Sequence, residues 1–173
     1  MSRLHPIVAI DGPAGAGKSS VAREVAKALG YVLVDTGALY RGLALAARER
    51  NVAWTDGPAL GALADALELH FEVSDEGPLL HIDGVNRADD IRSPDVSEGA
   101  SPVSAHPAVR AASLCIQRRL GAEGGVVLEG RDIGTVVCPA AQVKLFLTAS
   151  PDEPALRRVQ DLEGPALITT LHQ

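Results

Sequence analysis

The feature that most constrains this chain is the segment GPAGAGKS at residues 12–19, which directly follows an apolar run at residues 7–10. Glycines at this spacing let the backbone bend so that successive N–H groups point at phosphate oxygens. A helical pattern follows the segment and ends at Gly30, a residue type that commonly closes a helix. An apolar strand, a glycine-rich loop and a helix in this order predict a P-loop that binds ATP or GTP.

The phosphate loop supplies the first set of candidate site residues. Lys18 is expected to reach the β and γ phosphates, and the Ser19 hydroxyl is expected to bind the accompanying Mg²⁺. The predicted cofactor-binding residues are Gly12, Pro13, Ala14, Gly15, Ala16, Gly17, Lys18, Ser19 and Ser20.

Length and composition limit what else the chain holds. At 173 residues and 46% hydrophobic content, the chain can bury one core with room for a small inserted subdomain. No apolar run approaches the roughly 20 residues of a membrane-spanning helix, and the N-terminal apolar run is too short for a signal peptide. The net charge of −6 argues against a nucleic-acid polymer as partner. We therefore expect a cytoplasmic protein, monomeric, whose ligands are small nucleotides.

The two cysteines indicate neither a metal site nor a disulfide. Cys115 and Cys138 are far apart in the sequence and have no paired spacing. Both are expected to be small buried residues.

Apolar runs alternate with helical patterns, which is typical of a parallel sheet with crossover helices. The predicted strands are residues 7–10, 31–34, 126–128 and 143–147. The predicted helices are the one that follows the phosphate loop and ends at Gly30, and residues 38–50, 58–69, 107–120 and 152–162. The fold class is therefore α/β, a three-layer α/β/α P-loop NTPase fold with a parallel sheet.

One segment departs from this alternation. Residues 70–84 alternate apolar and polar side chains around the turn SDEG, which predicts an antiparallel hairpin. The following residues, 84–106, are rich in Asp, Ser and Pro and are expected to be irregular or weakly helical. We expect residues 68–105 to form an inserted subdomain that recognises the substrate, and residues 1–67 with 106–173 to form the kinase core.

Charged residues follow two of the predicted strands. The second strand ends in VDTGALYRG, which carries Asp35, Thr36, Tyr40 and Arg41. In an open α/β sheet the ligand crevice lies outside the carboxyl ends of the strands, so these residues are candidates for substrate binding. The alternative is that Asp35 or Thr36 only caps the next helix while Arg41 is solvated.

The third strand ends in VVLEGRDIGT, which places three more charged residues at the same edge of the sheet. Glu129 can orient magnesium or its waters together with Asp35 and Ser19, and Arg131 can neutralise a phosphate. Asp132 lies directly beside Arg131. Arg157 and Arg158 follow a helix-start pattern, SPDE, and would act only if a lid closed over ATP.

Two blocks of the sequence resemble bacterial cytidylate kinases, which phosphorylate CMP and dCMP with ATP. The blocks are IDGPAGAGKSSVAREVAKALGYVLVDTGALYR at residues 10–41 and LEGRDIGTVVCPAAQVKLFLTAS at residues 128–150. The P-loop is shared by many enzymes, whereas DTGALYR and GRDIGT together are specific. The hairpin insertion is also similar to the enlarged CMP-binding domain of the longer bacterial form.

The resemblance implies roles for individual residues. Arg41 and Arg131 match arginines that hold the CMP phosphate, and Ser101, Arg110 and Asp132 match positions that contact cytosine. Such a set complements the amino donor and the two acceptors of cytosine, whereas uracil would leave the acid unpaired. The predicted catalytic residues are Lys18, Arg41, Arg131 and Arg158, with ATP and Mg²⁺ as cofactors.

The sequence departs from the family pattern at two places. Glu129 stands where many relatives carry aspartate, and the resemblance is expected to fade after Arg158. Members of the family continue well beyond this point, so the resemblance implies a kinase core that is truncated or diverged at its C-terminus. The loss of the family's C-terminal segment predicts weak nucleotide binding and little turnover, which leaves open a remnant that binds nucleotide without catalysis. Other open alternatives are a different acceptor, such as AMP, UMP, dTMP or shikimate, and a GTPase-type switch, although the chain has no Asn-Lys-x-Asp motif.

Overall fold

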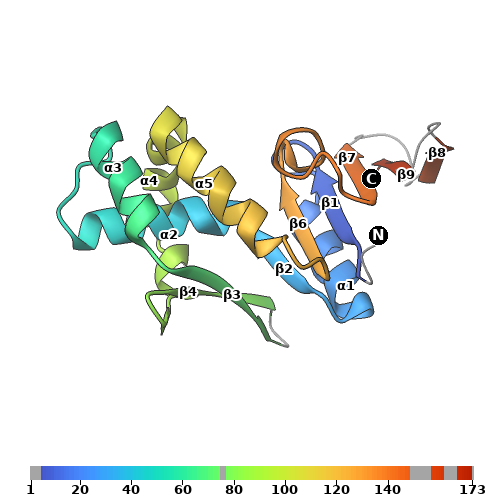
Figure 1. Cartoon of the computed structure of the whole chain (residues 1–173), viewed down its shortest axis with the longest axis horizontal. Helices are drawn as coiled ribbons and strands as arrows, with labels where there is room; N and C mark the ends of the chain where they lie inside the picture. Colours follow the sequence, from blue (N-terminus) through green and yellow to red (C-terminus); the bar gives the residue numbers. More distant parts are fainter. Residues whose placement is uncertain (1–4, 75–76, 149–156, 162–166, 173) are drawn as a thin grey trace. The chain divides into compact units, whose positions relative to one another are not determined.

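The computed structural model describes residues 5–74, 77–148, 157–161 and 167–172, the last two ranges as backbone only. The chain forms two compact units (Figure 1). The first unit comprises Met1–Asp35 and Leu120–Gln173, and the second unit comprises Thr36–Arg119.

The first unit is built around one sheet whose strand order is β2-β6-β1-β7-β9-β8. Its strands are β1 (Ile7–Asp11), β2 (Val32–Asp35), β6 (Val126–Gly130), β7 (Val143–Thr148), β8 (Arg157–Asp161) and β9 (Leu167–His172). β2, β6, β1, β7 and β9 pair in parallel, each with the next in this order. β8 pairs antiparallel with β9. The four strands predicted from the sequence are therefore confirmed.

Helix α1 (Lys18–Leu29) packs on this sheet because its small side chains recur at helical spacing. Ala22 and Ala26 are buried against strand residues such as Ile10 and Val127. Gly30 closes the helix with φ 66° and donates its N–H to the carbonyls of Ala26 and Lys27. The predicted C-cap is confirmed, and only a residue that tolerates a left-handed backbone suits this position.

The second unit contains four helices and a small sheet within its described residues. The helices are α2 (Thr36–Glu49), α3 (Gly57–Ala66), α4 (Pro94–Ala105) and α5 (Pro107–Leu120), with a 3₁₀ turn, η1 (Asp90–Arg92). The strands are β3 (Leu69–Ser74), β4 (Gly77–Ile82) and β5 (Val85–Asn86). Helix α2 buries most of its residues and packs against α3, α4 and β4.

The predicted hairpin is confirmed and is extended by one strand. β3 pairs antiparallel with β4, and β4 pairs antiparallel with β5. Asp83 and Gly84 join β4 to β5 and have φ values of 50° and 79°. Positive φ at both central residues is the geometry of a type I′ turn, which Asp-Gly favours.

Four expectations from the sequence are wrong. Residues 94–105 form the regular helix α4, because Val96, Gly99 and Val103 share a buried face that compensates for the poor helix formers around them. Helix α3 ends at Ala66, and Leu69 already begins β3. Residues 157–161 form strand β8, where a helix was predicted. Cys115 is exposed, whereas Cys138 is buried as expected.

The fold class is confirmed as mixed α/β, with parallel strands and a small antiparallel sheet. The second unit, Thr36–Arg119, is longer at both ends than the insertion predicted at residues 68–105. It begins earlier in the chain because α2 packs against α3, α4 and β4 in the core of this unit. Among the described residues, no helix is both long and apolar enough to cross a membrane.

Gly99 lets α4 approach Trp54, and its replacement tests that packing. A Cβ at position 99 would lie 2.5 Å from the Trp54 ring, whose Nε1 donates to the carbonyl of Ala44 at 3.0 Å. Gly99→Ala should therefore destabilise the protein by about 1–3 kcal/mol, although alanine is the better helix former. Urea denaturation measures the change. Ser97→Ala, at an exposed position of α4, is the control, and equal stability of Gly99→Ala and wild type would contradict the packing.

Asp83 links two segments of the second unit through its carboxylate. It accepts the Glu68 N–H at 3.0 Å and a hydrogen bond from Arg50 at 2.6 Å, and these contacts hold its pKa below the usual value, against an opposing effect of burial. A lowered pKa stabilises the fold above the pKa of the unfolded chain, and this stabilisation disappears as the pH falls through the lower folded pKa.

Asp83→Asn keeps an acceptor and tolerates positive φ, so it removes mainly the charge. Because the pair is exposed, the expected loss at pH 7 is at most ~1 kcal/mol. Denaturation curves at pH 7 and pH 3 measure it, with the exposed Asp65→Asn as control. A difference between variant and wild type that persists undiminished at pH 3 would argue against this role of the charge.

Candidate functional site

The phosphate loop between β1 and α1 depends on three glycines with positive φ. Gly12, Gly15 and Gly17 have φ values of 153°, 78° and 77°. A Cβ on Gly12 would lie 2.2 Å from the carbonyl oxygen of Leu147 in β7, so no larger residue fits there. The backbone therefore leaves β1 in the bent course that the GPAGAGKS spacing predicts.

The loop delivers Lys18 and Ser19 as the first residues of α1. The first N–H groups of a helix lack partners within the helix and carry partial positive charge. The N-cap residue of α1 is Gly17, which has no side chain to cap these groups, and the first turn has no acidic residue. The Lys18 amine donates to the carbonyl of Pro13 at 2.6 Å, so it lies folded back over the loop. This end of α1 suits an anion such as a phosphate group.

Two carboxylates stand beside the loop on neighbouring strands. Asp35, the last residue of β2, is the direct sheet partner of Glu129 in β6. Glu129 is buried, with 4% of its surface exposed, and accepts a hydrogen bond from the Ser19 hydroxyl at 3.0 Å. The structure thus brings together all three residues predicted to hold the metal.

Burial raises the pKa of Glu129 to about 7, and the negative charge of Asp35 adds to the increase. The Ser19 hydrogen bond and the nearby Lys18 and Arg23 oppose it. Two carboxylates and a hydroxyl offer the hard oxygen donors that Mg²⁺ prefers, and a divalent cation would offset their repulsion. The residues present therefore fit a magnesium ion whose remaining ligands are water or phosphate oxygens.

A further residue of this edge, Asp11, was missed in the sequence. Its buried carboxylate accepts the N–H groups of Ile133 and Gly134 at 2.7 and 2.8 Å. These residues begin a π-helical turn, η2 (Ile133–Val137), directly after Arg131 and Asp132. An acid at the end of an apolar run was the available signal, because such a side chain is rarely buried without partners.

The other predicted site residues are divided between the two units. Arg131, which is exposed, and Asp132, which is half-buried, belong to the first unit. Those in the second unit are Thr36, Tyr40 and Arg41 on α2, Ser101 on α4 and Arg110 on α5. Arg158 lies in β8, and its side chain falls outside the described residues.

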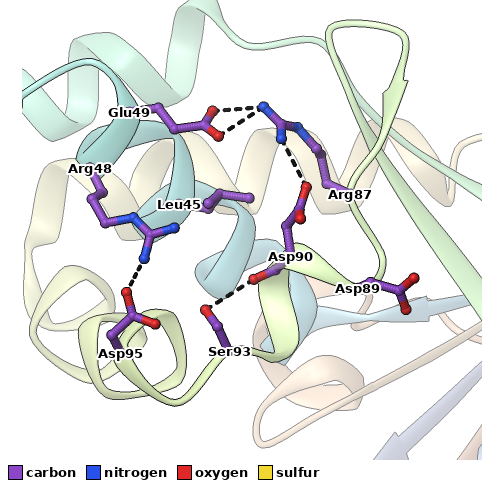
Figure 2. A pocket seen from close by; sticks show the side chains of 8 residues that line it. All are labelled: Leu45, Arg48, Glu49, Arg87, Asp89, Asp90, Ser93 and Asp95. Carbon is purple, nitrogen blue, oxygen red and sulfur yellow. Dashed lines mark hydrogen bonds and ion pairs between the residues drawn. The ribbon is translucent and has the colours of Figure 1, made fainter.

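The cavity drawn in Figure 2, of about 340 Å³, is in the second unit and contains no predicted site residue. Five of its charged groups form ion pairs with one another. One guanidinium nitrogen of Arg87 donates to both carboxylate oxygens of Glu49 at 2.9 and 2.8 Å, and the other donates to Asp90 at 2.8 Å. Arg48 pairs with Asp95 (Figure 2). These ion pairs join α2 to η1 and α4.

A parallel sheet with a glycine-rich loop between its first strand and first helix defines a P-loop nucleotide-binding protein. A family model described as Cytidylate kinase matches residues 8–172. The chain therefore belongs to the cytidylate kinase family. The match continues past Arg158, so the expectation that the resemblance fades there is wrong.

Individual relatives agree with the family assignment. The chain is 48% identical to a cytidylate kinase of Pelotomaculum thermopropionicum over 169 residues, which are 97% of this chain and 75% of that protein. It is 46% identical to a cytidylate kinase of Syntrophotalea carbinolica, covering 96% of this chain and 71% of the relative. A bifunctional pantoate ligase/cytidylate kinase of Prochlorococcus marinus is 49% identical over 95% of this chain, which spans 34% of the relative's length.

Glu129→Gln tests the electrostatic origin of the raised pKa in the metal-free protein. A carboxyl whose pKa is higher in the folded than in the unfolded chain lowers the free energy of unfolding when it ionises. For Glu129 this loss of stability develops as the pH rises from about 4.5 to about 7 and is complete above that range. The glutamine variant should therefore be more stable than wild type at pH 8, by about 1–3 kcal/mol, and equally stable near pH 4.

Denaturation in the presence of a chelator, at pH 4 and pH 8, measures this difference. Glu123→Gln replaces an exposed glutamate of the same unit and should be neutral at both values. A glutamine variant no more stable than wild type at pH 8 would show that Glu129 ionises without hindrance.

Proposed function

We propose that this chain transfers a phosphoryl group from MgATP to CMP or dCMP, giving CDP or dCDP and ADP. Membership of the cytidylate kinase family supports the acceptor class, and the phosphate loop supports the donor. The single observation that carries the proposal is the start of α1, where Lys18 and Ser19 adjoin the buried Glu129 carboxylate.

On the donor side, the backbone N–H groups of Gly12 and of residues 14–20 bind the phosphates of ATP, while Pro13, which has no N–H, shapes the loop. Lys18 neutralises the β and γ phosphates, and its short bond to the Pro13 carbonyl is exchanged for phosphate oxygens. Ser19 would hold Mg²⁺, and Asp35 and Glu129 would orient its water ligands. When bound, the ion neutralises charge on the transferring phosphate.

On the acceptor side, Arg41 and Arg131 align the phosphate of CMP. Thr36 and Tyr40 contact the acceptor nucleotide, and Ser101, Arg110 and Asp132 recognise cytosine. The phosphate oxygen that attacks is already anionic, so no general base is needed, and catalysis consists of alignment and charge neutralisation. Arg158 shields the moving group when the donor site closes.

A panel of acceptors tests the proposed function. Release of ADP from MgATP is measured with CMP, dCMP, AMP, UMP, dTMP and shikimate in turn. Turnover with CMP and dCMP alone is expected. Equal or faster turnover with another acceptor would refute the specificity. If thermal shift shows that ATP and CMP bind but no ADP is released, the chain is a nucleotide-binding protein that lacks turnover.

The proposal also includes the monomeric state and the cytoplasmic location expected from the sequence.

Arg131→Ala tests the acceptor site separately from the donor site. Loss of a charge-assisted contact to phosphate should lower kcat/KM for CMP by about 100-fold or more, with little change in the affinity for ATP. Steady-state kinetics with each nucleotide varied in turn give both values. Arg92→Ala is the matched control, since Arg92 is exposed and its ion pair with Asp89 is long, at 3.7 Å. An unchanged KM and kcat for CMP in Arg131→Ala would remove Arg131 from the site.

A further inference from the structure

Asp11 is the last residue of β1 and directly precedes the phosphate loop. Its side chain is buried, with 7% of the residue exposed. Both carboxylate oxygens accept backbone N–H groups from residues more than a hundred positions away, Ile133 at 2.7 Å and Gly134 at 2.8 Å. Short bonds to an ionised acceptor are stronger than those between neutral groups. Asp11 therefore joins the base of the loop to a distant segment.

The bonded N–H groups are the first two of the π-helical turn η2, which directly follows Arg131 and Asp132. Asp132, at the position that usually caps such a turn, makes no capping hydrogen bond, and Asp11 supplies the cap in its place. A Cβ on Gly134 would lie 3.2 Å from the Asp11 carboxylate and 3.2 Å from the Lys144 side chain. Glycine at this position lets the turn come close to the acid.

Asp11 itself is held firmly in the sheet. It pairs with Gly130 of β6 on one side and with Phe146 of β7 on the other. The next residue, Gly12, packs directly on the β7 backbone. A displacement of the Asp11 backbone would therefore require β1 and the start of the phosphate loop to move with it.

We propose that Asp11 is a positioning residue that fixes the Arg131–Asp132 segment relative to the phosphate loop, so that the acceptor phosphate is presented in line with the donor. The inference rests on the proposed function, in which Arg131 and Asp132 bind the acceptor nucleotide. Asp11 touches neither nucleotide. It acts through the backbone N–H groups that it holds, and its loss should affect the acceptor more than the donor.

Asp11→Asn tests this role with almost no change in size. The amide retains one acceptor but directs an N–H donor at the second backbone N–H, so one bond is lost and two donors face each other. Amide hydrogen exchange at Ile133 and Gly134 should become at least about tenfold faster, because their protection depends on this carboxylate. The KM for CMP should rise about tenfold or more, with the ADP dissociation constant changed less than about threefold.

Asp56→Asn is the matched control, because Asp56 also caps a helix through a backbone N–H, that of Ala59 at 3.0 Å. It should leave the KM for CMP and exchange at Ile133 and Gly134 unchanged. Unchanged exchange at these two residues in Asp11→Asn would overturn the proposal, and so would faster exchange with a normal KM for CMP. If the wild-type chain does not phosphorylate CMP, the proposed function has failed, and the exchange measurement still decides whether Asp11 holds the turn.

Discussion

The rest of the site depends on the tight bend with which the backbone leaves β1. Gly12 lies so close to the carbonyl of Leu147 that a side chain would overlap it, and Gly15 and Gly17 take left-handed conformations. This course ends in the first turn of α1, whose first N–H groups have no partners within the helix. Lys18 and Ser19 are brought to the carboxyl edge of the sheet, where Ser19 meets Glu129.

Three acids of this edge lie on neighbouring strands, yet their surroundings give them different roles. Asp11 is satisfied by two backbone N–H groups and so acts on the conformation of another segment. Glu129 accepts a hydrogen bond from the Ser19 hydroxyl, while its burial and the neighbouring Asp35 make ionisation harder. A carboxylate whose ionisation is opposed by burial and by a second acid is suited to a cation supplied with the substrate.

Much of the first unit could be predicted because its signals are local. The runs at residues 7–10 and 126–128 are buried and apolar, and the loop motif and Gly30 specify backbone conformations directly. Helix α4 was missed because Pro102, Gly99 and several serines are poor helix formers, and only packing of its buried face compensates for them. Asp11 was missed because its two partners are distant in the sequence.

The sequence by itself determined the phosphate loop, the parallel strands, the hairpin and the charged residues at the strand ends, since each depends on a short pattern or on glycine geometry. The tertiary structure decided the burial, the electrostatic environment and the hydrogen bonds of those charged residues. The raised pKa of Glu129 requires burial and the neighbouring strand that carries Asp35, and the bonds of Asp11 require a turn that the chain reaches only after folding. Electrostatic environment depends on distance in space, which a linear pattern does not contain.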